Sequence, residues 1–278
     1  HPLDIADDWR ELEDAQVLRD GGFAHDLIRE ATLRSVPEPI ARLLHAQIAQ
    51  RLEGHGGAPA RIAAHWRAAG RWTEAAAQYL AAAATAQRAS QRRLEAELLA
   101  SAAECSAHAG DRAGEFSARE RLFHALRYVA RFDAQAAAVD ALAALAGAPA
   151  ERAAMLEARA TLASDDQQDQ ACLDAAREAG ALARNSGDRA RALSVVRLEA
   201  RALARMNRAA EAIELLSRHA DEARGWRDGV LGARVLSDLG ATLVICDRNA
   251  DAMPLLDDAL VVARALDDHG LTLEILQH

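Results

Sequence analysis

A turn motif that recurs every 40 residues constrains this chain more than any other feature of its sequence. The spacing Ala-Arg-x-x-x-Asp begins at residues 183, 223 and 263. A second type of turn lies between these, at residues 207–212 and again at residues 247–252. Two turn types that alternate about every 20 residues predict a repeat made of a helix, a short turn and a second helix.

The helices after the second type of turn share one apolar stripe. It comprises Ala212, Leu215, Leu216, His219, Ala220 and Ala223, matched by Ala252, Leu255, Leu256, Ala259, Leu260 and Ala263. The spacing i, i+3, i+4, i+7 is one face of an α-helix. Because one hairpin cannot bury such a face alone, neighbouring hairpins are expected to stack on each other and form the core.

The composition supports an all-α fold. Alanine and leucine dominate the 51% of hydrophobic residues, aromatic residues make up 4%, and there are six prolines in 278 residues. Alanine and leucine favour helices, whereas strands favour the β-branched and aromatic residues that are scarce here. The predicted helices span residues 72–88, 91–109, 112–129, 132–146, 150–164, 167–186, 188–206, 208–224, 227–246 and 249–267.

This pattern resembles the tetratricopeptide repeat (TPR). The residues that fall on the family's large, Leu-Gly, aromatic and alanine positions are Leu236, Leu239, Gly240, Leu243, Ala252 and Ala259. The period here is 40 residues, longer than the repeat of about 34 residues typical of that family. The resemblance implies a TPR-like, right-handed α-solenoid of antiparallel hairpins over residues 58–278, with about five hairpins and a truncated C-terminal end.

Residues 1–57 do not follow the repeat. The sequence predicts a helix over residues 8–15, a β-hairpin over residues 17–23 that turns at two glycines, and a helix over residues 26–34. An amphipathic helix over residues 41–52 follows. Helix, hairpin and helix in this order fit the C-terminal part of a winged-helix unit, so the expected domains are residues 1–57 and residues 58–278.

The segments Phe23–Ala31, Leu44–Ala49 and Ala64–Gly70 resemble bacterial signal-transduction ATPases of the STAND type. The resemblance spans about residues 8–90 and includes LuxR-like and adenylate-cyclase-like multidomain regulators. It implies that the chain is the end of a winged helix followed by the sensor repeats of a transcriptional regulator. The ATPase core of such a regulator would lie outside this chain and would be one of its partners.

His25 and Asp26 are similar to the His-Asp dipeptide of plant disease-resistance ATPases, in which the histidine senses bound ADP. This resemblance implies a nucleotide-sensing role for His25 in the intact protein, since an imidazole can donate a hydrogen bond to a phosphate oxygen. The alternative is that His25 caps the helix that follows it.

No catalytic constellation is visible in the sequence. All 33 basic residues are arginine, which excludes a phosphate-binding loop of the Walker type and Schiff-base chemistry. The sequence has neither an H-E-x-x-H nor a C-x-x-C motif, and Cys105, Cys172 and Cys246 are expected to be isolated buried thiols. We therefore expect a protein that is not an enzyme and uses no cofactor and no metal ion.

The candidate ligand site is a row of arginines. Arg197, Arg201 and Arg205 lie at i, i+4 and i+8 on the first helix of one repeat, and Arg234 lies near the same level in the next repeat. In the TPR register, Arg197, Arg201 and Arg234 would point into the concave groove, where that family binds its ligands. Arginine forks suit carboxylate or phosphate groups. The alternative is a solvated face on which these arginines pair with nearby acids.

The net charge of −9 argues against direct contact with nucleic acid. Because no apolar run reaches 18 residues, no membrane contact is expected and the protein is predicted to be cytoplasmic. The leading expectation is a non-catalytic repeat region that binds an effector small molecule, a peptide or a protein in its groove. The alternative is a stand-alone TPR adaptor that binds peptides or partner proteins.

Overall fold

The computed structural model describes residues 2–19, 22–129, 132–226 and 229–277. It divides into two compact units, His1–Ala82 and Ala83–His278. Helix α5 (Trp72–Arg88) runs across the division.

Up to α3, unit 1 has the element order that the sequence predicts, whereas α4 is a helix that was not predicted. It contains α1 (Pro2–Asp14), β1 (Leu18–Arg19), β2 (Gly22–Phe23), α2 (Asp26–Ser35), α3 (Glu38–Gly54) and α4 (Pro59–Ala68). The two strands are antiparallel, with Leu18 opposite Phe23. The α3 helix begins three residues before its predicted start because Pro39 stands in the first helical turn, where its missing N–H leaves no hydrogen bond unmade.

Helix α3 packs against α4. From the sequence, α3 was expected to belong to the N-terminal segment, residues 1–57, and the residues of α4 to the repeat region, residues 58–278. The domain boundary at residue 57 and the winged-helix assignment remain predictions.

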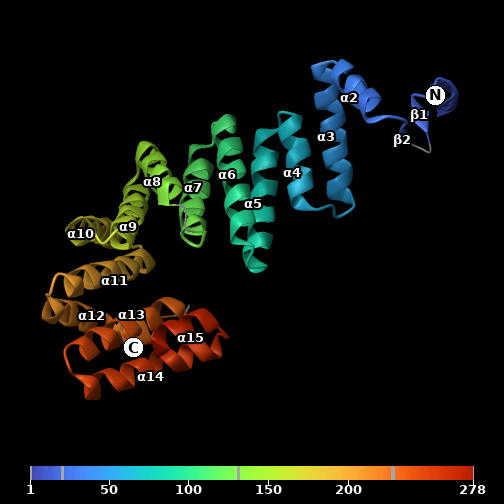
Figure 1. The fold of residues 1–278 in the computed structure, drawn as a ribbon. Helices are drawn as coiled ribbons and strands as arrows, with labels where there is room; N and C mark the ends of the chain where they lie inside the picture. The colour runs from blue at the N-terminus through green and yellow to red at the C-terminus, as the bar shows by residue number, and fades with distance from the viewer. Residues whose placement is uncertain (1, 20–21, 130–131, 227–228, 278) are drawn as a thin grey trace. The chain divides into compact units, whose positions relative to one another are not determined.

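Unit 2 is a stack of antiparallel helix hairpins, as Figure 1 shows. Its helices are α6 (Arg92–Ala109), α7 (Arg112–Arg127), α8 (Phe132–Leu145), α9 (Pro149–Asp165), α10 (Asp169–Ser186), α11 (Arg189–Arg205), α12 (Ala209–Arg224), α13 (Val230–Ile245), α14 (Asn249–Ala265) and α15 (His269–Leu276). Each helix packs against the next, and the predicted helices begin and end within three residues of these bounds. The predicted fold class, an all-α solenoid of TPR-like hairpins, is confirmed.

The regular period comes from the turns. Residues with a left-handed backbone, at positive φ, recur 20 residues apart at 70, 90 and 110, then at 167, 187 and 207, and then at 247 and 267. After each, the next N–H reaches back five residues, as Asp188 N does to Ala183 O at 2.9 Å. This bond closes the helix in the manner of a Schellman motif. Asp188 then caps the next helix by accepting from the N–H of Arg191 at 3.0 Å, so one helix ends and the next begins within two residues.

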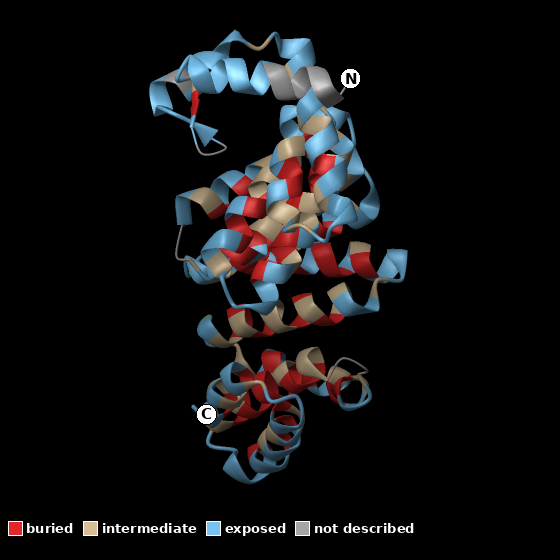
Figure 2. Cartoon of the chain, turned by 90° about the vertical axis from the view of Figure 1, so that its right-hand side faces the viewer, coloured by how far each residue is buried: buried red, intermediate tan, exposed pale blue. Residues whose placement is uncertain are grey.

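The core consists mainly of alanine and leucine. Four of the six residues in each predicted stripe are buried, including Leu216 and Ala259, and Figure 2 shows buried positions along the helices of unit 2. His219, which the stripe predicts as a core residue, is half-buried and lies with Nδ1 3.4 Å from Oε2 of Glu222. Cys105 and Cys172 are buried as expected, whereas Cys246, at the end of α13, is only half-buried.

The odd-numbered helices of unit 2 also contact each other. Helix α9 contacts α7 and α11, and α13 contacts α11 and α15. We call this set, α7, α9, α11, α13 and α15, the odd-helix layer. Within the described ranges, no helix combines the length and the apolar character needed to cross a membrane.

Candidate functional site

A pocket of about 480 Å³ lies on the odd-helix layer. The arginines that line it come from four helices and comprise Arg92, Arg121, Arg127, Arg197, Arg201 and Arg234. Only two acidic residues, Glu95 and Glu157, share the lining. We call this site the arginine pocket. The three arginines that the repeat register singles out, Arg197, Arg201 and Arg234, therefore lie in one pocket.

Arg205, the third arginine of the predicted row, does not line this pocket. Its side chain pairs with Asp169 and donates from Nη2 to Ser164 Oγ at 3.1 Å. Because helix α11 turns by about 100° per residue, eight residues rotate the side chain away from the position of Arg197. The row that the sequence suggests is thus split between two neighbouring sites.

Asp238 holds two of the pocket arginines. Arg197 Nε donates to Asp238 Oδ2 at 2.6 Å, and Arg201 Nε donates to Asp238 Oδ1 at 3.0 Å. Arg201 Nη2 also donates to Glu274 Oε1 at 3.2 Å. Asp238 is only 7% exposed, and a carboxylate so deeply buried needs cationic partners to remain charged. These contacts fix the direction of both guanidinium groups.

Burial affects the two arginines differently. Burial lowers the pKa of Arg197, whose side chain is 13% exposed, although Asp238 acts in the opposite direction. Burial also opposes the charge of Arg201, but Asp238 and Glu274 outweigh it and raise the pKa of Arg201. Both remain cations at neutral pH because a guanidinium does not lose its proton in proteins. The alternative drawn from the sequence was a solvated face on which these arginines pair with acids. Arg197 and Arg201 do pair with acids, but Arg197 is buried and not solvated.

Two other pocket arginines, Arg121 and Arg234, are paired more weakly with the described acids. Arg121 pairs with no acid among the described residues. Arg234 has a buried Nε with no hydrogen-bond partner in the described part of the chain, and the Glu274 Oε2 atom lies 3.8 Å from it. An unpaired buried donor costs free energy that an incoming acceptor would recover. Arg121 and Arg234 are thus the cations best able to hold an anionic group.

A second charged cluster joins three helices beside the pocket. Arg191 on α11 donates to Glu157 Oε2 on α9 at 3.0 Å and to Glu120 Oε1 on α7 at 3.1 Å. Ser194 Oγ also donates to Glu157, at 2.5 Å. Burial raises the pKa of Glu157, against the opposite effects of Ser194 and Arg191. Sequence reasoning missed this cluster, because Glu120 and Glu157 lie 71 and 34 residues from Arg191.

The rim of the pocket carries an aromatic ring. Tyr128 is 65% exposed, and the guanidinium of Arg92 lies over its ring, 4.6 Å from the centroid. Arg92 Nη1 also donates to the buried Glu95 at 2.9 Å. His124 lines the pocket as well, and burial lowers its pKa, so its imidazole is neutral at pH 7. Because its pKa is lowered, His124 gains a proton only in more acidic solution than an ordinary histidine does.

The arrangement is suited to binding. Its donors are guanidinium groups, which form charge-assisted hydrogen bonds to carboxylates and phosphates, often in pairs. The exposed ring of Tyr128 adds a surface on which an apolar or cationic part of a ligand can rest. In the described ranges, no three His, Cys, Asp or Glu side chains gather in a way that could hold a metal ion.

His25 lies in unit 1 and not in this pocket. It occupies the N-cap of α2, and its Nδ1 accepts a hydrogen bond from the N–H of Leu27 at 3.2 Å. This is the capping role that the sequence left open as an alternative. Nucleotide sensing by His25 concerns the intact protein and remains a prediction.

Comparison with solved structures gives remote likenesses. No family model and no curated protein match the chain. Among solved structures it is similar to YrrB, described as a TPR protein with an unusual peptide-binding site, with a TM-score of 0.41 and 14% identity over 73% of this chain and 92% of that chain. It is also similar to a putative kinesin light chain from Podosopora anserina with nearly identical TPR-like repeats, with a TM-score of 0.36 and 15% identity over 80% of this chain and 98% of that chain.

Proposed function

We propose that this chain is a non-catalytic binding module whose arginine pocket takes an acidic group of a peptide, a protein or an effector. One observation carries the proposal: six arginines from four helices line one pocket. Among the described residues, Arg121 pairs with no acid, and Arg234 has a buried Nε that makes no hydrogen bond. Arginine clusters of this kind recognise phosphorylated and acidic motifs in many binding domains.

The negative charge of the whole chain confines the binding of acidic ligands to this pocket. The net charge of −9 repels acidic molecules from most of the surface. Attraction is therefore local, and it depends on close contact with the guanidinium groups of the pocket. A ligand that binds must place its acidic group beside Arg121 or Arg234, with a second part free to contact the ring of Tyr128.

The proposal also covers the kind of protein in which this binding module would act. The resemblance over residues 8–90 supports a sensor region of a bacterial, STAND-type transcriptional regulator, cytoplasmic and in contact with its own ATPase core. The predicted order of helix, hairpin and helix in unit 1 agrees with this interpretation. A stand-alone TPR adaptor would use the arginine pocket equally well. A nucleotide-binding core encoded immediately upstream of His1 would favour the regulator, and a native start there would favour the adaptor.

The charge of the ligand is the first property to test. Isothermal titration calorimetry is carried out with a pentaglutamate peptide, a phosphoserine peptide and a neutral pentaglutamine peptide. We expect at least one acidic peptide to bind about tenfold more tightly than pentaglutamine, since one charge-assisted pair contributes on the order of 1.5–3 kcal/mol. The affinity should fall when NaCl rises from about 50 to about 300 mM, because salt screens exposed charges. Affinities for both acidic peptides equal to that for pentaglutamine would refute the proposal.

A further inference from the structure

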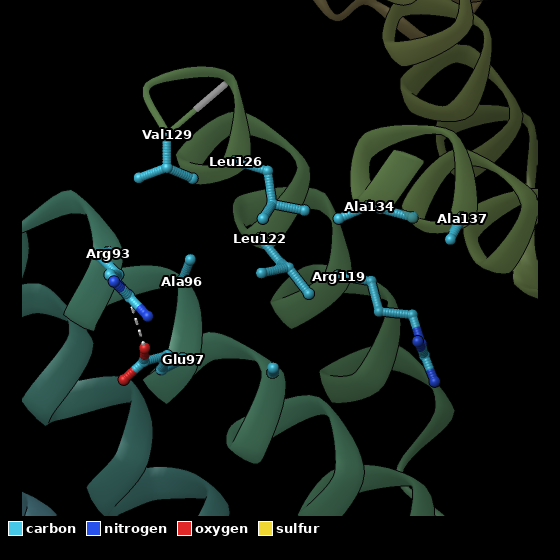
Figure 3. Close-up of a pocket in the computed structure, with 11 residues that line it drawn as sticks. Arg93, Ala96, Glu97, Arg119, Leu122, Leu126, Val129, Ala134 and Ala137 are labelled. Atoms are coloured by element: carbon cyan, nitrogen blue, oxygen red, sulfur yellow. Dashed lines mark hydrogen bonds and ion pairs between the residues drawn. The ribbon is translucent and has the colours of Figure 1, made fainter. Parts of the chain in front are cut away.

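A second pocket lies between α6, α7 and α8, with a volume of about 570 Å³. Leu122 and Leu126 of α7 form its floor, and Figure 3 shows them between Ala96 of α6 and Ala134 of α8. Further alanines of α6 and α8 complete its walls. Because alanine side chains are short, they leave the space above the two leucines open. We call this site the apolar pocket.

The charged residues at the edge of the apolar pocket neutralise each other. Arg93 Nε donates to Glu97 Oε1 at 3.3 Å, and Arg119 Nε donates to Glu115 Oε1 at 2.8 Å. Each pair lies on one helix at i and i+4. Among the described residues, the lining therefore offers no uncompensated charge, in contrast to the arginine pocket. A charged ligand would lose its hydration here without gaining a free partner, so the pocket favours an uncharged ligand.

The volume of the apolar pocket suits a small molecule better than a helix of a partner protein. Sites for small molecules typically have volumes of about 300–1,000 Å³ and mainly apolar linings. A single turn of helix, about 10 Å wide and 5.4 Å tall, already fills on the order of 400 Å³. The apolar pocket would thus admit little more than one turn of a partner helix, whereas a compact apolar molecule would fit entirely.

The two pockets use different faces of the same helices. On α7, Leu122 and Leu126 line the apolar pocket, whereas Arg121 and His124 line the arginine pocket. No residue lines both of them. A molecule in one pocket therefore leaves the other pocket open.

We propose that the apolar pocket binds an uncharged, mainly apolar small molecule, and that it does so without competing with an acidic ligand in the arginine pocket. The second half rests on the proposed function, and the first half is independent of it. The chain would then carry two sites of opposite chemical character on the hairpin of α6 and α7.

The test uses the uncharged fluorescent probe N-phenyl-1-naphthylamine. We expect saturable binding to the wild type, seen as an increase in fluorescence. Ala137→Phe fills the pocket from its exposed side and should weaken probe binding about tenfold or more, the equivalent of about 1.4 kcal/mol. Ala136→Phe is the matched control, because Ala136 is exposed on the same helix but does not line the pocket, and it should bind like the wild type.

Three results would overturn the proposal: no saturable binding, equal binding by both phenylalanine variants, or binding of an apolar helical peptide but not of the probe. Addition of pentaglutamate to the probe-saturated protein should leave the fluorescence unchanged. Displacement would contradict non-competition. If neither the pentaglutamate nor the phosphoserine peptide binds while probe binding depends on Ala137, the arginine pocket proposal fails and the apolar site stands.

Discussion

Replacement of Gly232 by alanine should lower the free energy of unfolding of the chain by about 2–3 kcal/mol. A Cβ atom at this position would lie 2.1 Å from the carbonyl oxygen of Ala223, which is backbone of α12, and 3.2 Å from Cβ of Trp226. Neither atom can rotate away, so α12 and α13 would have to separate. The higher helix propensity of alanine, about 1 kcal/mol, offsets only part of this cost.

Urea denaturation followed by circular dichroism at 222 nm measures this effect. Gly225→Ala is the matched control, because Gly225 is the C-cap of α12, its φ is −86°, and the nearest atom to a new Cβ is 3.7 Å away. It should change the free energy of unfolding by less than about 0.5 kcal/mol. If Gly232→Ala were as stable as Gly225→Ala, the close approach of α12 and α13 would be wrong.

Arg191→Met should destabilise the chain by about 2–4 kcal/mol at pH 7, since it leaves the carboxylates of Glu120 and Glu157 partly buried and without their shared cation. Arg189→Met is the control, because Arg189 is 74% exposed and pairs only with Glu222 among the described acids. A surface pair of this kind contributes about 0–1 kcal/mol. Thermal and urea unfolding of both variants measure the difference.

The pH dependence of the free energy of unfolding provides a second test of the Arg191→Met prediction. Burial already raises the pKa of Glu157, and the loss of Arg191 removes a charge that opposes this shift. An acid whose pKa is raised by folding binds protons more readily in the folded state than in the unfolded state. Its unfavourable contribution to the stability of the folded state therefore diminishes as the pH falls. The stability gap between Arg191→Met and the wild type should therefore narrow from pH 7 to about pH 4. A gap that stays constant over this range would contradict the assignment.

The features that local sequence determines were predicted well. The left-handed residue at 187 and the capping Asp188 are adjacent in the chain, and together they end one helix and begin the next. The positions of the helices follow from a succession of such turns. The grouping of Arg197 with Arg201 and Arg234 was likewise accessible, because it needs only the register of two adjacent repeats.

The features that depend on distant segments were not predicted. Arg92 joins the arginine pocket from more than a hundred residues before Arg197, and only the stacking of the intervening helices brings it there. Nothing in the sequence indicates that Asp238 differs from an exposed polar residue of α13. In the structure it is buried and pairs with Arg197 and Arg201. The apolar pocket depends on the separation of α6 and α8 above Leu122, which no helical period reveals.

The central claim is that the guanidinium groups of Arg121 and Arg234 in the arginine pocket hold the acidic group of a ligand. The double variant Arg121→Gln/Arg234→Gln tests it better than Arg201→Ala, because loss of Arg201 would also deprive the buried Asp238 of a partner. The matched control is Arg218→Gln/Arg248→Gln, which changes the net charge equally at two exposed arginines outside the pocket.

The decisive measurement is the calorimetric affinity of the acidic peptide for these two variants and the wild type. The arginine pocket predicts a loss of about tenfold or more in Arg121→Gln/Arg234→Gln and a change of less than about twofold in Arg218→Gln/Arg248→Gln. Equal affinities in the two double variants would contradict the claim, because binding would then depend on net charge and not on the pocket.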